Sequence, residues 1–289
     1  MSKRAILAHT VLTRVRETVT QLRLLVRPQG DDAVELKPSW FSAIDRRVSR
    51  RRFSGELPAE GRARVEAFCR DTGAAGAARV ELVAGDAGAM FTGLVGGYGA
   101  VSGMPLVAAL IARDGAEADV GYLGEALILE ATDAGLATCW IAGSFDRDRV
   151  ATLVGLRPGE RVVAVTPLGL PRERFSGGER LFRRSVRAAT RLGIDRIAPG
   201  IDAGSWPRWA LTATEAARRA PSGKNLQPWR FRFDGDGLVL SQTLKRYWTA
   251  PIDMGIARLH VELGAHHEGV GGAWQSLTLP DVARFVPHA

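Results

Sequence analysis

The sequence predicts an α+β fold, an α/β sandwich built from two degenerate halves of a single chain. Strand-like apolar runs alternate with helical segments along the 289 residues. The segment Gly255–Trp274 repeats the helix, glycine and strand pattern of Gly121–Trp140, and five of twenty positions are identical. Two polar motifs, at residues 47–53 and 221–229, each occur in one half only. The two halves are therefore predicted to complement each other.

The composition is that of a soluble globular protein, with 46% hydrophobic and 24% charged residues. The longest clean apolar run, Met104–Ala112, is much shorter than the ~20 residues that a membrane helix needs, and no signal peptide is expected. Cys69 and Cys139 form no CxxC pair and have no metal-ligand spacing, so we expect a reducing, cytoplasmic location. The formal net charge of +8 fits nucleic acid, an acidic membrane surface or phosphorylated ligands, or simply an arginine-rich composition.

The first 27 residues predict an amphipathic helix. Apolar residues recur there at steps of three or four, at Leu7, Val11, Val15, Val19, Leu22 and Val26. Basic residues surround this stripe, against a single acid, Glu17. We expect the helix to pack on the body of the protein; a helix lying on an acidic membrane surface is the alternative, and further self-association through residues 1–27 stays open. Residues 28–38 are predicted to be a linker.

A short helical segment after residue 38 leads into an alternating pattern of Arg47, Ser49, Arg51 and Phe53. In an extended chain the side chains at 47, 49 and 51 lie on one side and can converge on an anion. Arginine suits such a site because its planar fork donates paired hydrogen bonds to phosphate oxygens. A solvated basic face or a nucleic-acid patch along Arg46–Arg52 is the alternative. The run lacks the interleaved aromatic residues of single-strand binding, so no nucleic-acid partner is expected.

The sequence between residues 58 and 112 predicts a helix and two strands. The helix covers Pro58–Arg70, an alternating strand covers Arg79–Ala84, and Pro105–Ala112 is apolar throughout and therefore predicted to be buried. The glycine-rich run at 93–99 matches no nucleotide-binding motif and is predicted to be a turn, in which Tyr98 and Gly99 could line a pocket.

A helix rich in small residues follows and ends near Gly135, because glycine readily takes the left-handed conformation at a helix C-terminus. Leu136–Ile141 predict a short strand, and the next three residues predict a tight turn into another helix. Arg161–Leu170 predict a further buried strand. Basic residues follow this strand at Arg174, Arg180, Arg183 and Arg184, and helices are then predicted near Arg187–Arg191 and at Trp206–Arg219.

The second polar motif begins where a helix at Ala210–Arg219 must end, since Pro221 has no N–H and its ring clashes with the preceding turn. The small residues that follow let backbone amides approach a ligand, and Asn225 can both donate and accept hydrogen bonds. A strand at Arg230–Phe233 and another at Gly237–Gln242 come next. An ordinary turn beside a buried Trp229 is the alternative.

Three of these segments resemble the flavin-binding segments of the nitroreductase family. They are the arginine and serine alternation, the small-residue helix with its loop at Trp140, and the run Pro-Ser-x-x-Asn-x-Gln-Pro-Trp from Pro221. The resemblance covers residues 40 to about 280 and implies a nitroreductase-like fold with non-covalently bound FMN. It implies cofactor-binding roles for Arg47, Ser49, Arg51, Trp140, Ile141, Ala142, Gly143, Arg183, Arg184, Pro221, Ser222, Gly223, Asn225 and Gln227.

The resemblance also implies how these residues act. The arginines and Ser49 hold the flavin phosphate, with Arg183 or Arg184 as an additional partner. The loop at Gly143 places a backbone N–H near flavin N5, and Ala142 replaces an acid that the family often has there. Hydride passes from NAD(P)H to the flavin and then, by a ping-pong mechanism, to a small organic acceptor such as a nitroaromatic, a quinone or an enone. No protein side chain is expected to be catalytic, and His260, His266 and His267 match no metal motif, so no metal is expected.

In dimeric nitroreductases one flavin site draws the arginine and serine segment from one subunit and the Pro-Ser-x-x-Asn segment from the other. This chain resembles a tandem branch of the family in which one polypeptide mimics that dimer and a monomer suffices. We expect an extension at residues 1–38, a first half at 39–185 and a second half at 186–289. A non-catalytic protein that binds or sequesters flavin is the alternative, as is a flavin-dependent oxidase or dehydrogenase of a biosynthetic pathway.

Overall fold

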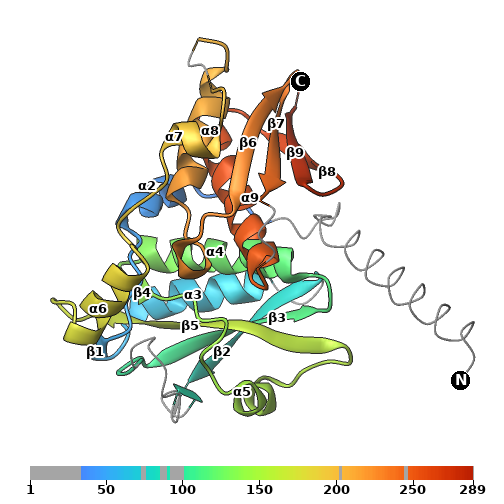
Figure 1. Ribbon diagram of the computed structural model, residues 1–289. Helices are drawn as coiled ribbons and strands as arrows, with labels where there is room; N and C mark the ends of the chain where they lie inside the picture. Colours follow the sequence, from blue (N-terminus) through green and yellow to red (C-terminus); the bar gives the residue numbers. More distant parts are fainter. Residues whose placement is uncertain are drawn as a thin grey trace, which may run out of the picture.

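The computed structural model describes residues 34–72, 76–84, 90–91, 101–201, 204–243 and 247–288. Two antiparallel sheets lie at opposite ends of the molecule, and helices pack between and around them (Figure 1). The helix predicted at residues 1–27 and the turn predicted at 93–99 lie outside the described residues.

The first sheet has the strand order β1-β5-β3-β2, with the short strand β4 paired to β5. Its strands are β1 (Phe53–Ser54), β2 (Ala78–Ala84), β3 (Leu106–Arg113), β4 (Ala137–Thr138) and β5 (Glu160–Pro171). Alternate residues of β3 belong to two separate apolar cores, with Leu110 in one and Ile111 in the other. Helices cover both faces, α3 (Ala59–Asp71) and α4 (Glu117–Asp133) on one and α5 (Arg147–Val154) on the other (Figure 1). This double coverage explains why residues 106–112 of β3 and 162–165 of β5 are apolar and buried.

The second sheet has the order β6-β7-β9-β8. Its strands are β6 (Trp229–Asp234), β7 (Gly237–Gln242), β8 (Gly272–Ser276) and β9 (Asp281–Pro287). The remaining helices are α2 (Pro38–Arg46), α6 (Gly177–Ser185), α7 (Ile194–Ile197), α8 (Arg208–Arg219) and α9 (Ala250–His267), with a 3₁₀ turn at Gly223–Asn225. Both sheets therefore come from continuous stretches, one before residue 172 and one after residue 228.

Helices α4 and α9 pack against each other at the centre of the molecule, and almost every residue of both is buried. Glycines allow their close approach. A Cβ at Gly121 would overlap the backbone carbonyl of Ile252, and a Cβ at Gly255 would overlap that of Ala118. The same interval along the chain separates Gly121 from Gly255 and Ala118 from Ile252. The contact is thus reciprocal, as at a two-fold interface.

A second correspondence concerns one buried glutamate on each central helix. Glu125 of α4 accepts a hydrogen bond from Trp140 Nε1 at 2.7 Å and lies 3.1 Å from Nε2 of His260 on α9. Glu262 of α9 accepts from Trp274 Nε1 at 2.6 Å and from the hydroxyl of Tyr122 on α4 at 2.7 Å. Each carboxylate therefore joins a tryptophan that follows its own helix to a side chain of the opposite helix.

Most of the predicted elements are confirmed to within two residues, and Gly135 has the expected positive φ of 78° just past α4. Two predictions are wrong. The strand predicted at Leu136–Ile141 is only two residues long, because the chain turns away where the Trp140 indole reaches Glu125. Arg187–Arg191 is not helical, since α6 already ends at Ser185 and Arg187 has a φ of +49°.

The glycine contacts make a direct prediction for stability. We expect Gly121→Ala to lower the free energy of unfolding by about 3 kcal/mol, the upper part of the range for overpacked cores, because the obstacle is a backbone carbonyl that cannot rotate away. Gly178→Ala on α6 is the matched control, because a Cβ there meets nothing within 4 Å. Urea unfolding measures both variants. Equal stability of the two would contradict the close helix contact.

Candidate functional site

Glu125 forms the centre of the candidate site. The side chain is fully buried and joins three parts of the chain: the loop at Trp140, His260 of α9, and Arg47 just after α2, whose Nε lies 3.7 Å from the carboxylate. Both ring nitrogens of His260 face acceptors, since Nδ1 lies 3.0 Å from the carbonyl of Ala216. His260 thus lies between the Glu125 side chain and the backbone of α8, inside the protein.

Several guanidinium groups gather beside this carboxylate. Burial, followed by the charges of Arg47, Arg218 and Arg183, lowers the pKa of Arg191 to about 10. Burial and then the charges of Arg47 and Arg50 also lower the pKa of Arg183. A lowered pKa means that the protein holds these positive charges against their mutual repulsion. An anion bound among them would relieve that repulsion.

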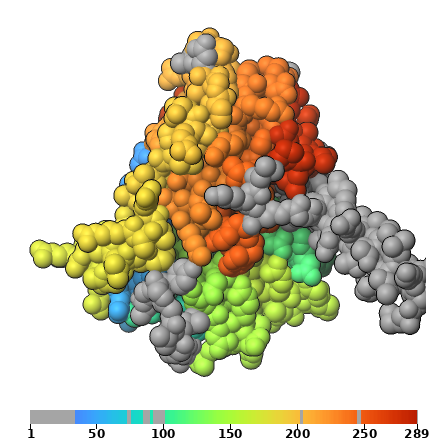
Figure 2. All heavy atoms as spheres, in the orientation of Figure 1, coloured from blue at the N-terminus to red at the C-terminus, as the bar shows by residue number. Residues whose placement is uncertain are grey.

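Helix α6 carries Arg183 and projects from the body as the yellow lobe in Figure 2. Glu179 fixes this helix to the arginine segment: its Oε1 accepts from the backbone N–H of Arg51 at 2.7 Å, and its Oε2 completes a capping box with Ser176. Burial alone would raise the pKa of Glu179, but the backbone hydrogen bonds from Arg51 and Ser176 outweigh it and leave the pKa below its usual value. The position of Arg183 is thereby tied to that of residues 50–52.

The predicted alternation of residues 47, 49 and 51 is only partly realised. Arg47 Nη1 donates to Ser49 Oγ at 3.5 Å, so these two side chains do lie together. Arg51 instead lays its guanidinium 3.9 Å from the ring centre of Phe182. Arg50, which the alternation did not include, shares the ring of Phe175 with Arg183, at 4.4 and 4.5 Å. Arg184 is exposed.

The turn after Pro221 uses its polar side chains inside the protein. Asn225 donates through Nδ2 to the carbonyls of Arg187 and Thr190, and its Oδ1 accepts from Arg191 Nη1 at 3.1 Å. Ser222 Oγ accepts from the N–H of Gln227, and Gln227 Oε1 accepts from the N–H of Leu192. The hydrogen bonds of Asn225 therefore hold the Arg187–Arg191 segment in place. They also position the Arg191 side chain near the arginine cluster that contains Arg47.

The same turn is conformationally strained. Lys224, Asn225 and Gln227 all have positive φ, at 50°, 58° and 49°. Non-glycine residues in this left-handed region cost about 1–2 kcal/mol each. Strain of this kind is concentrated at binding sites, where the surrounding structure imposes it. The cost is offset here by the hydrogen bonds of Asn225 and Gln227.

The first residues of α9 and the segment before it contact both predicted cofactor loops. A side chain at Gly223 would overlap Thr249 Oγ1 and the ring of Tyr247. A Cβ at Gly143 would lie 3.4 Å from the indole of Trp248. Trp248 is 58% exposed, whereas the other six tryptophans are buried or half-buried. Gly143 of the first half and Gly223 of the second half thus lie on either side of residues 247–249.

Sequence reasoning missed the residues that connect the motifs, namely Glu125, Arg191, Trp248, Asp253 and His260. Glu125 and His260 were detectable as polar residues within apolar, buried helices.

Trp140 lies at the site through its bond to Glu125. Ile141 uses its backbone N–H and carbonyl in a bridge to Val165, and the Ala142 carbonyl accepts from Arg147. Pro221 ends the segment after α8, as expected.

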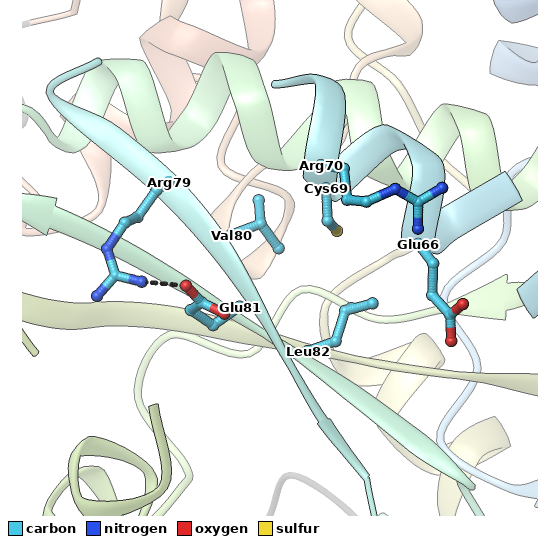
Figure 3. Close-up of a pocket in the computed structure, with 7 residues that line it drawn as sticks. All are labelled: Glu66, Cys69, Arg70, Arg79, Val80, Glu81 and Leu82. Carbon is cyan, nitrogen blue, oxygen red and sulfur yellow. Dashed lines mark hydrogen bonds and ion pairs between the residues drawn. The ribbon is translucent and has the colours of Figure 1, made fainter. Parts of the chain in front are cut away.

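A shallow hollow of about 390 Å³ lies elsewhere, between α3 and β2 (Figure 3). Its lining includes Cys69, with Arg79 and Glu81 of β2 joined by an ion pair. Burial, with smaller contributions from Glu81 and Glu66, raises the pKa of Cys69 to about 12, so the thiol stays protonated and unreactive near neutral pH. The hollow shares no residue with the cluster around Glu125 and is not part of the candidate site.

Within the described residues, no group of three or more histidine, cysteine, aspartate or glutamate side chains is placed to hold a metal ion. None of the described helices combines the length and hydrophobicity needed to cross a bilayer.

Comparison with known proteins agrees with this fold. Residues 40–265 match the family described as “Putative TM nitroreductase”. The structure is similar to that of “a putative nitroreductase” from Thermotoga maritima MSB8, with a TM-score of 0.57 and 21% identity over 89% of this chain and 98% of that one. No curated protein matches the sequence.

Two further structures share less with this chain. One is an FMN-dependent nitroreductase from Clostridium difficile R20291, with a TM-score of 0.38 and 15% identity over 46% of this chain and 89% of that one. The other is a nitroreductase with bound FMN from Desulfitobacterium hafniense DCB-2, with a TM-score of 0.36 and 18% identity over 48% of this chain and 92% of that one.

The central position of Glu125 leads to a prediction about stability. We expect Glu125→Ala to lower the free energy of unfolding by about 3–5 kcal/mol, because it leaves the charge of Arg47 and two buried donors without their acceptor. Glu66→Ala is the control, since Glu66 is 40% exposed and its pair with Arg62 contributes well under about 1 kcal/mol. Urea unfolding followed by circular dichroism measures both, and similar losses would refute the central role of Glu125.

Proposed function

Because the chain belongs to the nitroreductase family described as “Putative TM nitroreductase”, we propose that it is an FMN-dependent oxidoreductase. In this proposal the flavin is bound non-covalently by both halves of the chain, and its phosphate lies among the guanidinium groups of Arg47, Arg183 and Arg191. The substrates are small molecules: NAD(P)H as reductant, and a nitroaromatic, quinone or enone as acceptor.

The observation that carries the proposal is the convergence of the two polar motifs on one place. Arg47 follows α2 in the first half, whereas Arg191 is held by Asn225 of the second half. Arg191 and Arg183 both have pKa values lowered by burial and by the nearby charge of Arg47. Motifs more than 170 residues apart in sequence thus contribute to a single positively charged region.

The donors present fit a phosphate monoester. Arginine donates paired hydrogen bonds that match phosphate oxygens, and Glu125 is the carboxylate whose charge acts on Arg191 from within the cluster. Ser49 adds a hydroxyl beside Arg47. By contrast, Ser222, Asn225 and Gln227 already use their side chains within the turn. The backbone N–H groups of Gly223, Asn225 and Gln227 are bonded inside the protein as well, so the turn supports the proposed site by shaping it.

A bound flavin would supply the two-electron chemistry, and the chain contributes the groups that hold and shield it. The arginine cluster binds and orients the phosphate. Gly143 and Gly223 lack side chains, which lets Trp248 lie against the first and Thr249 and Tyr247 lie against the second. The exposed indole of Trp248 lies against Gly143 and would restrict the entry of water.

The two cysteines and the absence of a disulfide pattern support a cytoplasmic location.

The reciprocal glycine contacts of α4 and α9 support the proposal that one chain mimics a dimer and that the monomer holds a complete site. In this arrangement residues 39–185 and 186–289 correspond to the two subunits. A flavin-sequestering protein would bind FMN with the same residues, and steady-state NAD(P)H oxidation with an added acceptor distinguishes it from an enzyme.

The phosphate assignment is tested with two ligands. We expect Arg47→Ala to weaken FMN binding about ten- to a hundredfold, because a charge-assisted hydrogen bond contributes about 1.5–3 kcal/mol, and to leave riboflavin binding nearly unchanged. Flavin fluorescence quenching measures both dissociation constants, with Arg62→Ala as the control for loss of a surface charge. Equal weakening of FMN and riboflavin would assign Arg47 a structural role, and no saturable FMN binding by the wild-type protein would refute the flavin proposal.

The single-chain site is tested by complementation. Arg47→Ala and Asn225→Ala proteins, each folded but impaired, are unfolded and refolded together. If the site lies within one chain, every molecule keeps one defective half and the mixture binds no more FMN than the separate variants. Recovery of binding in the mixture would show that sites form between chains. Each variant refolded alone is the control.

A further inference from the structure

One buried carboxyl group is not used by the proposed function. Asp253, in the first turn of α9, is 2% exposed, and its Oδ1 accepts a hydrogen bond from the backbone N–H of Gly223 at 2.9 Å. Its Oδ2 is buried without a hydrogen-bond partner among the described residues. We propose that Asp253 is a positioning residue for the candidate site: its protonated carboxyl group holds the Gly223–Asn225 turn closed, and loss of that proton releases the turn.

The contact is enclosed from two sides. Thr249 and Asp253 are four residues apart at the start of α9, so their side chains lie on the same face of the helix. Thr249 Oγ1 lies so close to Gly223 that any Cβ there would overlap it, and this hydroxyl is also buried without a partner among the described residues. The glycine therefore fits between two side chains of a single helix face.

The position of the Gly223–Asn225 turn determines the position of Arg191, one of the proposed anion-binding residues. Gly223 begins the 3₁₀ turn that ends at Asn225, and Asn225 binds Arg191 and two carbonyls of the preceding segment. Lys224 and Asn225 have positive φ, so the turn needs external support to keep this shape. The bond between Asp253 and Gly223 supplies that support at the first residue of the turn.

The surroundings of Asp253 contain no compensating charge. α9 packs on α2, α4, α8 and β7, and β7 has no titratable side chain. The titratable groups of the other elements, of α9 itself and of the Gly223–Asn225 turn are Asp45, Arg46, Glu117, Asp119, Tyr122, Glu125, Glu130, Asp133, Arg208, Glu215, Arg218, Arg219, Lys224, Arg258, His260, Glu262, His266 and His267. None of these, nor Tyr247 beside the turn, forms an ion pair or hydrogen bond with Asp253 in the described structure.

Burial raises the pKa of Asp253 to about 8, opposed by the hydrogen bond from Gly223. The sign of the effect follows directly. In the open turn water reaches the carboxylate, and its pKa is the ordinary value of about 4. The pKa is raised in the closed turn, so the closed turn is fully favoured below about pH 4 and loses up to tenfold in population for each pH unit between about 4 and 8. Above pH 8 the carboxyl group is ionised in both states, and the balance changes no further.

The inference is tested by amide hydrogen exchange of residues 221–227, with Asp253→Asn as the variant. Asparagine keeps the Oδ1 acceptor for Gly223 and cannot ionise. At each pH from 5 to 10 the two proteins are compared directly, so that the intrinsic pH dependence of exchange cancels. We expect protection in the wild-type protein to fall by up to tenfold per unit from pH 5 to about 8 relative to Asp253→Asn, and to level off above pH 8. Identical pH dependence in the two proteins would overturn the inference.

Two further measurements complete the test. Thr249→Val removes the neighbouring hydroxyl without removing the titrating group, so it should keep the pH dependence. If Asp253→Asn fails to fold, the wild-type protein alone decides, by comparison of residues 221–227 with β3 as an internal reference. A fall in protection up to about pH 8, followed by a plateau and confined to the turn, supports the inference, and its absence overturns it.

Because the choice of ligand rests on the proposed function, FMN affinity is measured in parallel at pH 7 and above, where phosphate ionisation is nearly complete. We expect FMN affinity of the wild-type protein to fall between pH 7 and about 8 and then to level off, and that of Asp253→Asn to stay level throughout. A pH step in exchange without FMN binding at any pH would refute the proposed function and leave the role of Asp253 intact. FMN binding without any Asp253-dependent step would refute this inference alone.

Discussion

A carboxylate that is wholly removed from water is stable only if donors surround it, and this requirement organises the centre of the protein. Glu125 meets it with groups from separate elements: the indole of Trp140, the imidazole of His260 and the guanidinium of Arg47. Each partner comes from a different segment: Arg47 follows α2, Trp140 follows β4 and His260 lies on α9. The positions of the α2 C-terminus, the loop after β4 and helix α9 are consequently interdependent, and the candidate site lies where they meet.

The features that sequence predicted well are those set by local chemistry. Pro221 ends a helix wherever it occurs, Gly135 adopts a left-handed conformation at a helix end, and a continuous apolar run such as residues 105–112 belongs inside a covered sheet. These signals sufficed for the elements and for the fold. Residues 47 and 225, which the family resemblance assigns to one flavin site, both lie near Arg191. That they bind one flavin stays a prediction.

The individual contacts could not be predicted, because long-range packing decides them. The alternation of residues 47, 49 and 51 implies that their side chains point in one direction. Arg51 instead packs its guanidinium on the ring of Phe182 in α6, and Arg50 packs on the ring of Phe175. Arg187–Arg191 has helical composition, but Asn225 binds its carbonyls and holds it as a turn. In the sequence, Asp253 is an ordinary acidic residue near a helix N-terminus. Only the folded chain shows that its carboxyl group accepts a hydrogen bond from Gly223.

The packing of α4 on α9 has a consequence for behaviour in solution. Between separate subunits, the stability of such an interface depends on protein concentration. Here both helices belong to one polypeptide, and the segment between them holds them at a fixed effective concentration however little protein is present. The central interface, and the buried carboxylates that cross it, are therefore independent of dilution.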